Sequence, residues 1–173
     1  MFLRKSASPR EPLPVAMIGL RMGDRVVQIG LADVRLMIAL AVKPGISGRS
    51  AVIVNDDREA VRAQSAAAEA GTLIETHVAT GTLPFDDAAF DVAIIHGVDA
   101  PLAECHRVLR DGGRLVVIEP GTRAGLAALL HSKEPAGDPA ATIAAAHRAG
   151  FKAVRLLADK EGYRFIEGVR AQT

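Results

Sequence analysis

Residues 83–121 read LPFDDAAFDVAIIHGVDAPLAECHRVLRDGGRLVVIEPG, and this stretch decides the fold. Phe90–Val98 is a nearly continuous apolar run, which predicts a buried strand. In Pro101–Arg110 the apolar residues recur at the spacing of a helix face. Two glycines then interrupt the pattern, and Arg114–Ile118 is a second apolar strand. A strand, a helix and a strand in this order predict a right-handed crossover between parallel neighbours.

The rest of the chain continues this alternation, with local signals at the helix ends. Asp56 can cap a helix, Glu59 is its capping-box partner three residues on, and Gly71 is suited to the helix end. Asp138 and Pro139 mark another helix start. The remaining predicted strands are Arg25–Gly30, Ala51–Asn55, Thr72–Ala79, and an antiparallel hairpin of Lys152–Ala158 and Tyr163–Arg170. The remaining predicted helices are Pro14–Leu20, Leu31–Lys43, the segment between Asp56 and Gly71, and Ala140–Ala149.

Composition limits the classes of partner. The 173 residues fit one core, and a net charge of +1 gives no support for binding to nucleic acid or to an anionic membrane. The longest apolar stretch, Leu36–Val42, is too short to span a bilayer, so no membrane span is expected. The single cysteine, Cys105, excludes an intramolecular disulfide and fits a reducing compartment, so we expect a cytoplasmic protein.

The order LPF, FDVA, helix, RVLRDGGRLV and EPG resembles class I S-adenosylmethionine-dependent methyltransferases, in particular small-molecule enzymes related to those of quinone biosynthesis. The resemblance covers about residues 23–170. It implies an α/β fold with a doubly wound, seven-stranded, mostly parallel Rossmann-like sheet in the order 3-2-1-4-5-7-6, with the antiparallel hairpin at one edge. Residues 1–22 would form an N-terminal arm and short helix, and residues 23–173 the methyltransferase-like domain.

The resemblance also implies a cofactor site for S-adenosylmethionine. The family's first loop reads as an acid and three glycines at alternate positions. Here Gln28 replaces the acid, Gly30 keeps the first glycine, and Ala32 and Val34 replace the other two. A β-branched Val34 would crowd the loop if the backbone there needed a positive φ.

Two further contact positions have lost their acids. Asn55 lies where the family's ribose-binding acid ends the second strand, with Asp56 one step later, where it can cap the helix instead. Counting back from LPF places Ala79 at the adenine-binding acid, with Thr80 beside it. Losing two or three hydrogen bonds of about 1.5–3 kcal/mol each would weaken binding by roughly 10²–10⁵-fold, so we expect low or absent affinity for the cofactor.

His96 is the candidate catalytic residue, because it ends the fourth strand, where the family often carries a polar side chain near the methyl donor. An imidazole there could act as a general base or could only line the cleft. No residues have metal-ligand spacing, and Cys105 belongs to an apolar helix face.

Two functions remain open at this point. The first is methyl transfer to a small-molecule substrate. The second is a catalytically inactive fold that acts as a binding or assembly module for a protein partner or a second copy of the chain, since an apolar cleft without a lid would suit either. Residues 1–22 and 121–137, with a helical turn at Ala124–Leu130, are the candidates for a lid.

Overall fold

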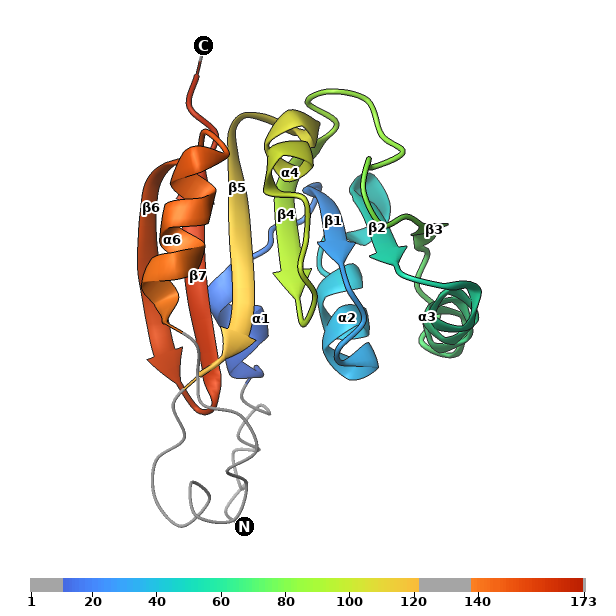
Figure 1. Cartoon of the computed structure of the whole chain (residues 1–173). Helices are drawn as coiled ribbons and strands as arrows, with labels where there is room; N and C mark the ends of the chain where they lie inside the picture. Colours follow the sequence, from blue (N-terminus) through green and yellow to red (C-terminus); the bar gives the residue numbers. More distant parts are fainter. Residues whose placement is uncertain (1–10, 122–137, 173) are drawn as a thin grey trace, which may run out of the picture.

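The computed structural model describes residues 11–121 and 138–172, and a seven-stranded sheet forms their centre (Figure 1). The strand order is β3-β2-β1-β4-β5-β7-β6. The first five strands are parallel, and β7 runs antiparallel to both β5 and β6. The predicted order and the antiparallel hairpin at the edge are therefore confirmed. The strands are β1 (Arg25–Ile29), β2 (Arg49–Val54), β3 (Glu75–Val78), β4 (Phe90–His96), β5 (Leu109–Pro120), β6 (Lys152–Lys160) and β7 (Tyr163–Val169).

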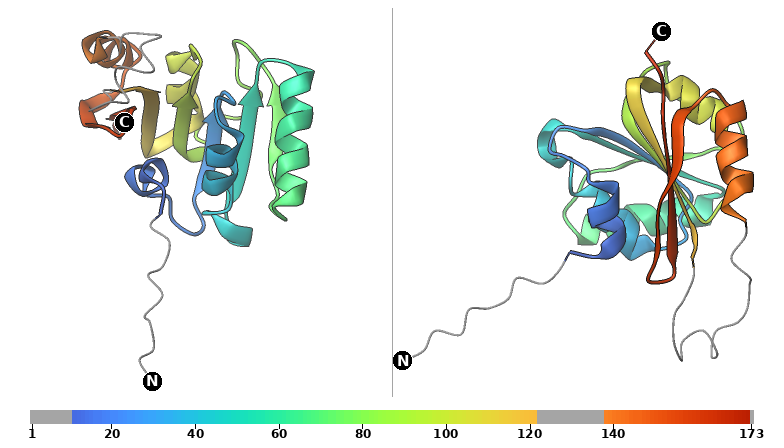
Figure 2. Two further views of the ribbon diagram at one scale, coloured as in Figure 1. Left: turned by 90° about the horizontal axis from the view of Figure 1, so that it is seen from below. Right: turned by 90° about the vertical axis from the view of Figure 1, so that its left-hand side faces the viewer.

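Helices cover both faces of the sheet (Figure 2). On one face α1 and α2 pack against the even-numbered residues of β1 and β4, and α3 continues this layer over β2. On the other face α4 and α6 cover the odd-numbered residues. Strand alternation thus sends neighbouring side chains to different layers. The helices are α1 (Leu13–Ile18), α2 (Val34–Ala41), the short 3₁₀ turn η1 (Gly45–Ser47), α3 (Asp57–Glu69), α4 (Leu102–Val108) and α6 (Pro139–Arg148).

The predicted helix ends are largely correct. The Asp56 side chain accepts from the Glu59 backbone N–H at 2.8 Å, and the Glu59 carboxylate accepts from the backbone N–H of Asn55 at 3.0 Å. The reciprocal bond therefore reaches one residue further back than the capping box predicts. Asp138 caps α6, with Pro139 in the first turn. The lid candidates at residues 1–10 and 122–137 lie outside the described residues.

Several predicted boundaries were wrong, and three of them changed most. The helix expected over Leu31–Lys43 begins only at Val34, because Asp33 caps it and leaves Leu31–Asp33 as a loop. The strand expected over Thr72–Ala79 is limited to β3, which pairs only with β2. The strand expected at Arg114 already begins at Leu109, because the Gly-Gly segment is itself paired: Gly112 N–H donates to the Arg170 carbonyl at 2.9 Å.

Candidate functional site

The candidate site lies at the carboxyl ends of β1, β2, β3 and β4, around the loops that follow these strands (Figure 1). β1 pairs with β2 on one side and β4 on the other, so the order of the strands reverses here. Ligands of open α/β sheets bind at such a switch point.

A cavity of about 150 Å³ lies here on the α4 side of the sheet. It brings together Gly30, Asn55, Ala79 and Thr80, four of the eight residues predicted to contact the cofactor. Three of its side chains are polar and can form hydrogen bonds: Asn55, Thr80 and Asp99. The full lining is Ile29, Gly30, Ile53, Asn55, Ala79, Thr80, Gly81, Leu83, Val98, Asp99 and Pro101.

Gln28 and His96, two other predicted contacts, line a second and much smaller cavity of about 10 Å³ next to α2. Both have the strand parity that faces α2, so neither lines the larger cavity. Gln28 is only 4% exposed, and its Nε2 donates to the Met37 carbonyl at 3.1 Å. Its amide therefore ties β1 to α2, whereas the sequence placed it only in the cofactor loop. Gly30 lines both cavities.

The environment of His96 sets its protonation. Desolvation lowers the pKa of its half-buried imidazole, and the nearby Asp33 carboxylate raises it by less. The imidazole is therefore mostly neutral at pH 7 and can accept a proton. The Asp33 carboxylate also caps α2, because it accepts from the backbone N–H groups of Arg35 at 2.8 Å and Leu36 at 3.3 Å.

The two remaining predicted contacts, Ala32 and Asp56, take part in packing and helix capping. Ala32 packs against Gly97 of the loop after β4, and Asp56 caps α3. Val34 begins α2 and is absent from the described non-glycine residues with positive φ, which are Ala88, Ala153 and Glu161. The crowding expected for a positive φ at Val34 therefore does not arise.

The loop after β4 closes onto the loop after β1. Gly30 has φ +93°, and a Cβ placed there would lie 2.8 Å from a Val98 methyl and closer still to the His96 carbonyl. Gly97 has φ +73°, and a Cβ there would overlap the Ala32 side chain. Only glycine at both positions allows this contact. The contact lies at Gly30, which with Ile29 lines both cavities.

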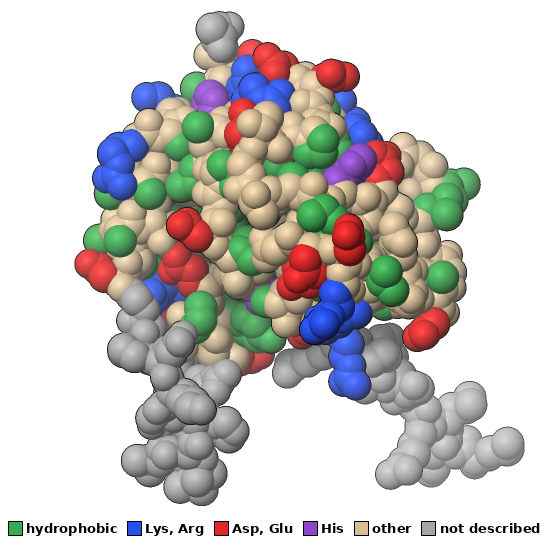
Figure 3. Space-filling model, turned by 45° about the vertical axis from the view of Figure 1, so that its right-hand side comes forward, with side chains coloured by type: hydrophobic (Ala, Val, Ile, Leu, Met, Phe, Trp, Pro, Cys, Tyr) green, Lys and Arg blue, Asp and Glu red, His purple; other side chains and the backbone are tan. Residues whose placement is uncertain are grey.

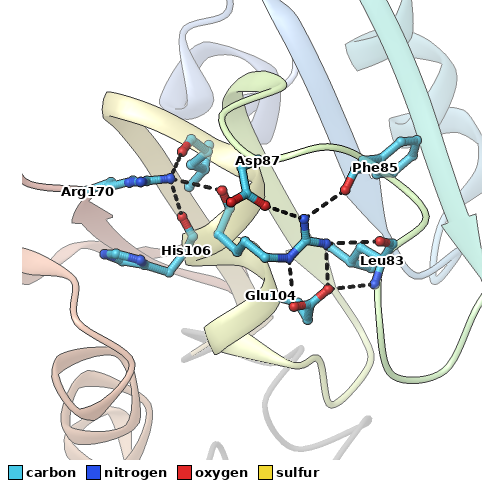
Figure 4. A network of polar contacts seen from close by, with 8 residues as sticks. Leu83, Phe85, Asp87, Glu104, His106 and Arg170 are labelled. Atoms are coloured by element: carbon cyan, nitrogen blue, oxygen red, sulfur yellow. Dashed lines mark hydrogen bonds and ion pairs between the residues drawn. The ribbon is translucent and has the colours of Figure 1, made fainter.

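A polar network on α4 fixes the LPF segment, which borders the larger cavity (Figure 4). The Arg107 guanidinium donates to the carbonyls of Leu83 at 3.0 Å and Phe85 at 2.8 Å, and to Asp87 at 2.8 Å. Glu104 accepts from Arg107 at 2.7 Å and from the Leu83 backbone N–H at 2.9 Å. The hydrogen bond from Arg107 lowers the pKa of Glu104 to about 2.

Sequence reasoning missed several residues of the site. Val98, Asp99 and Pro101 line the larger cavity, yet the sequence assigned Val98 only to the end of a strand. Gly97 was the available signal, because a glycine after an apolar strand indicates a turn that can bring the next residues over the site. Asp33 was also missed, although an Asp before an apolar helical run is a capping signal.

Cys105 is fully buried, and desolvation raises the pKa of its thiol to about 12. Such a thiol is unsuited to nucleophilic chemistry. Within residues 11–121 and 138–172, no three His, Cys, Asp or Glu side chains are grouped to hold a metal ion. No helix in the same ranges is long and apolar enough to span a bilayer. On the face in Figure 3, acidic and basic side chains are interspersed, in keeping with the small net charge.

Known proteins share this architecture. Residues 27–117 match the family model described as a methyltransferase domain, whereas no curated protein sequence matches the chain. An S-adenosylmethionine-dependent methyltransferase from Aquifex aeolicus is 16% identical, with a TM-score of 0.76 over 91% of this chain and 88% of that one. A putative methyltransferase from Haloferax volcanii, in complex with the Trm112 activator, is 19% identical, with a TM-score of 0.67 over 91% and 87%. The cyclase SpnF is 15% identical, with a TM-score of 0.69 over 92% and 79%.

Proposed function

Because the chain belongs to the methyltransferase domain family, we propose that it binds S-adenosylmethionine at the carboxyl ends of β1, β2 and β3 and transfers the methyl group to a small molecule. One observation carries this proposal: Gly30, Asn55, Ala79 and Thr80, which are far apart in the sequence, line one cavity at the switch point of the sheet.

The cavity suits the nucleoside half of this cofactor. Apolar side chains of Ile29, Ile53 and Leu83 can pack against a purine ring, while Asn55 and Thr80 can bond its polar groups. The exposed Asp99 carboxylate is a further acceptor for a hydroxyl or an amino group. These groups replace only part of what the missing acids would supply, so we expect binding weaker than a site with both acids would give.

His96 is the proposed general base. When bound, the cofactor's sulfonium would supply a methyl group to an oxygen, nitrogen or carbon nucleophile. Because desolvation lowers its pKa, His96 is neutral at pH 7 and can take the proton that the nucleophile loses. Most of the rate would come from holding the two reactants in line. His96 lines the smaller cavity beside Gly30, on the opposite face of the sheet from the nucleoside cavity, so a methyl acceptor would require this cavity to widen.

The second candidate is a non-catalytic binding or assembly module. The contact of Val98 and the His96 carbonyl with Gly30 favours it, because this contact narrows the path across the cofactor loop. The similar Haloferax protein forms a complex with an activator, so a protein partner is a reasonable proposal for this chain too. The similarity to a cyclase fits the rule that this fold alone does not fix the reaction.

Titration calorimetry with S-adenosylmethionine tests the two candidates on the full chain. Micromolar binding that weakens at least tenfold in Asn55→Leu, but not in the matched surface variant Gln64→Leu, would support the methyltransferase. No binding at millimolar ligand would contradict it and favour the module. The cytoplasmic location, the homo-oligomer and the link to quinone biosynthesis stay predictions.

A further inference from the structure

Two cavities of unequal size border Ile29 and Gly30, one on each face of the sheet. The cavity lined by Asn55 and Thr80 has about 150 Å³, and the cavity lined by His96 has about 10 Å³. Sites for small molecules typically enclose about 300–1,000 Å³. The larger cavity lies below this range, so it can enclose only part of a small molecule, and the smaller cavity has room for about one water molecule.

Val98 lines the larger cavity and covers the Gly30 backbone at its edge. Its two methyl groups lie 2.8 and 2.9 Å from the point where a Gly30 Cβ would be, so they rest directly on the Gly30 backbone. Val98 also packs against the apolar cluster on the α4 side, which includes Leu83 and Ile95. The side chain is thus held from both directions, by the cofactor loop and by the core.

We propose that the cleft is a nucleoside site in which Val98 excludes an amino-acid tail, so that an adenine nucleoside without the tail binds more tightly than one that carries it. This inference rests on the proposed function, because it assigns the larger cavity to the nucleoside half of the same ligand. A nucleoside in this cavity lies beside Val98 and does not have to pass it. A tail must cross Gly30, which requires Val98 to leave its apolar contacts.

The contact of Val98 with Gly30 lowers the affinity for the complete ligand by an amount that depends on how often Val98 opens. If the open position of Val98 is only a minor state, the apparent dissociation constant rises in inverse proportion to the open fraction. A ligand confined to the nucleoside cavity touches Val98 only at the cavity wall and does not need it to open. The ratio of the two affinities therefore measures the closure by Val98, independently of the absolute affinity of the pocket.

The test compares two thioethers that differ in the tail. 5′-Deoxy-5′-methylthioadenosine has the nucleoside and sulfur, and S-adenosylhomocysteine adds the amino-acid part. Calorimetry of the wild-type chain should show the first binding about tenfold tighter or more, as expected for an open fraction near 10%. Val98→Ala should strengthen S-adenosylhomocysteine binding about fivefold and change the other ligand less than about twofold. Val61→Ala on the exposed face of α3 is the matched control and should keep the wild-type ratio.

The outcomes separate the two proposals. If S-adenosylhomocysteine binds the wild-type chain as tightly as methylthioadenosine, or more tightly, the exclusion of the tail by Val98 is refuted. The methyltransferase proposal then still stands. An unchanged ratio in a folded Val98→Ala variant also refutes the exclusion of the tail. If neither ligand binds at millimolar concentration, both the nucleoside site and the methyltransferase proposal fail. Circular dichroism checks the fold of each variant, and the wild-type ratio is decisive even if Val98→Ala does not fold.

Discussion

Arg107 and Glu104, one turn apart on α4, bind both backbone groups of Leu83 and also bind each other. Arg107 Nη2 donates to the Leu83 carbonyl at 3.0 Å and to Glu104 Oε2 at 2.7 Å, and the same carboxylate oxygen accepts from the Leu83 N–H at 2.9 Å. The ring formed by these bonds fixes the segment that leads from the candidate site into β4 (Figure 4). Leu83 itself is buried and lines the larger cavity.

Arg107→Lys should destabilise the protein although it keeps the charge. An ammonium cannot donate to Leu83, Phe85 and Glu104 together, because it lacks the planar fork of the guanidinium. We expect a loss of about 2 kcal/mol in the free energy of unfolding, measured by urea denaturation. Arg62→Lys, an exposed change on α3, is the matched control and should change stability by less than about 0.5 kcal/mol. Equal effects of the two changes would contradict the role assigned to Arg107.

Stability should fall in acid through two carboxylates. For Asp91, burial raises the pKa, but hydrogen bonds from Arg25 and Arg110 outweigh this and lower it from 3.8 to about 2. For Glu104, the bond from Arg107 lowers the pKa from 4.5 to about 2. The unfolded chain therefore binds more protons, so this stabilisation is present above pH 4.5 and is lost as the pH falls towards about 2.

Urea denaturation at several pH values between 6 and 2.5 measures this loss. Glu104→Gln should lower stability at pH 6 by about 1 kcal/mol and should flatten the dependence on pH. Glu69→Gln, at an exposed site on α3, should leave the slope unchanged. A wild-type slope retained in Glu104→Gln would show that Glu104 does not contribute to it.

Asn55→Asp and Ala79→Asp should each strengthen nucleoside binding. Both positions line the larger cavity, where a carboxylate could accept from ribose hydroxyls or from the adenine amino group. Each bond could add about 1.5–3 kcal/mol, or roughly 10- to 100-fold in affinity, less the cost of desolvating the carboxylate. The gain at position 55 should be the smaller, because the Glu59 carboxylate already lies at the Asn55 backbone N–H.

5′-Deoxy-5′-methylthioadenosine is the appropriate ligand for this measurement, since it has no tail that must pass Val98. Ala79→Asn is the control for position 79, because it has the size of Asp without the charge. The two gains should roughly add if the sites do not interact. No gain in either folded variant would mean that neither position contacts the nucleoside.

His96→Gln should lower the turnover of an active enzyme more than its affinity for the cofactor. Glutamine keeps a polar side chain beside Gly30 but cannot accept a proton at neutral pH. Because desolvation lowers the pKa of His96, wild-type turnover should hold to below pH 6.5 before it declines. This decline should disappear in the variant. Unchanged turnover in His96→Gln would assign the imidazole to packing alone.

Local patterns in the sequence were sufficient for the alternation of strands and helices. The apolar runs at Phe90–Val98 and Arg114–Ile118, with a helix between them, predicted parallel neighbours, and β4 and β5 pair in this way. Capping residues such as Asp56 and Asp138 placed helix starts, because an N-cap depends on one side chain and the backbone N–H groups next to it. The strand order followed from the family resemblance.

Boundaries set by distant partners were less predictable. β5 begins at Leu109 because Leu109 pairs with Phe90 and Gly112 bonds to Arg170, residues far away in the sequence. Glu161 and Gly162 both have positive φ and form a two-residue turn, so β6 extends to Lys160, beyond the predicted end at Ala158.

The sequence by itself determined which residues gather at the switch point, because Gly30, Asn55 and Ala79 directly follow parallel strands whose carboxyl ends share one edge. Only the tertiary structure decided how they are used. Strand parity turned Gln28 and His96 towards α2, and Gln28 is bonded to Met37 there. The positive φ of Gly97 folded Val98 back onto Gly30, a contact between residues 68 positions apart in the chain. Such a contact depends on the packing of two loops from different strands, which no local pattern in either loop specifies.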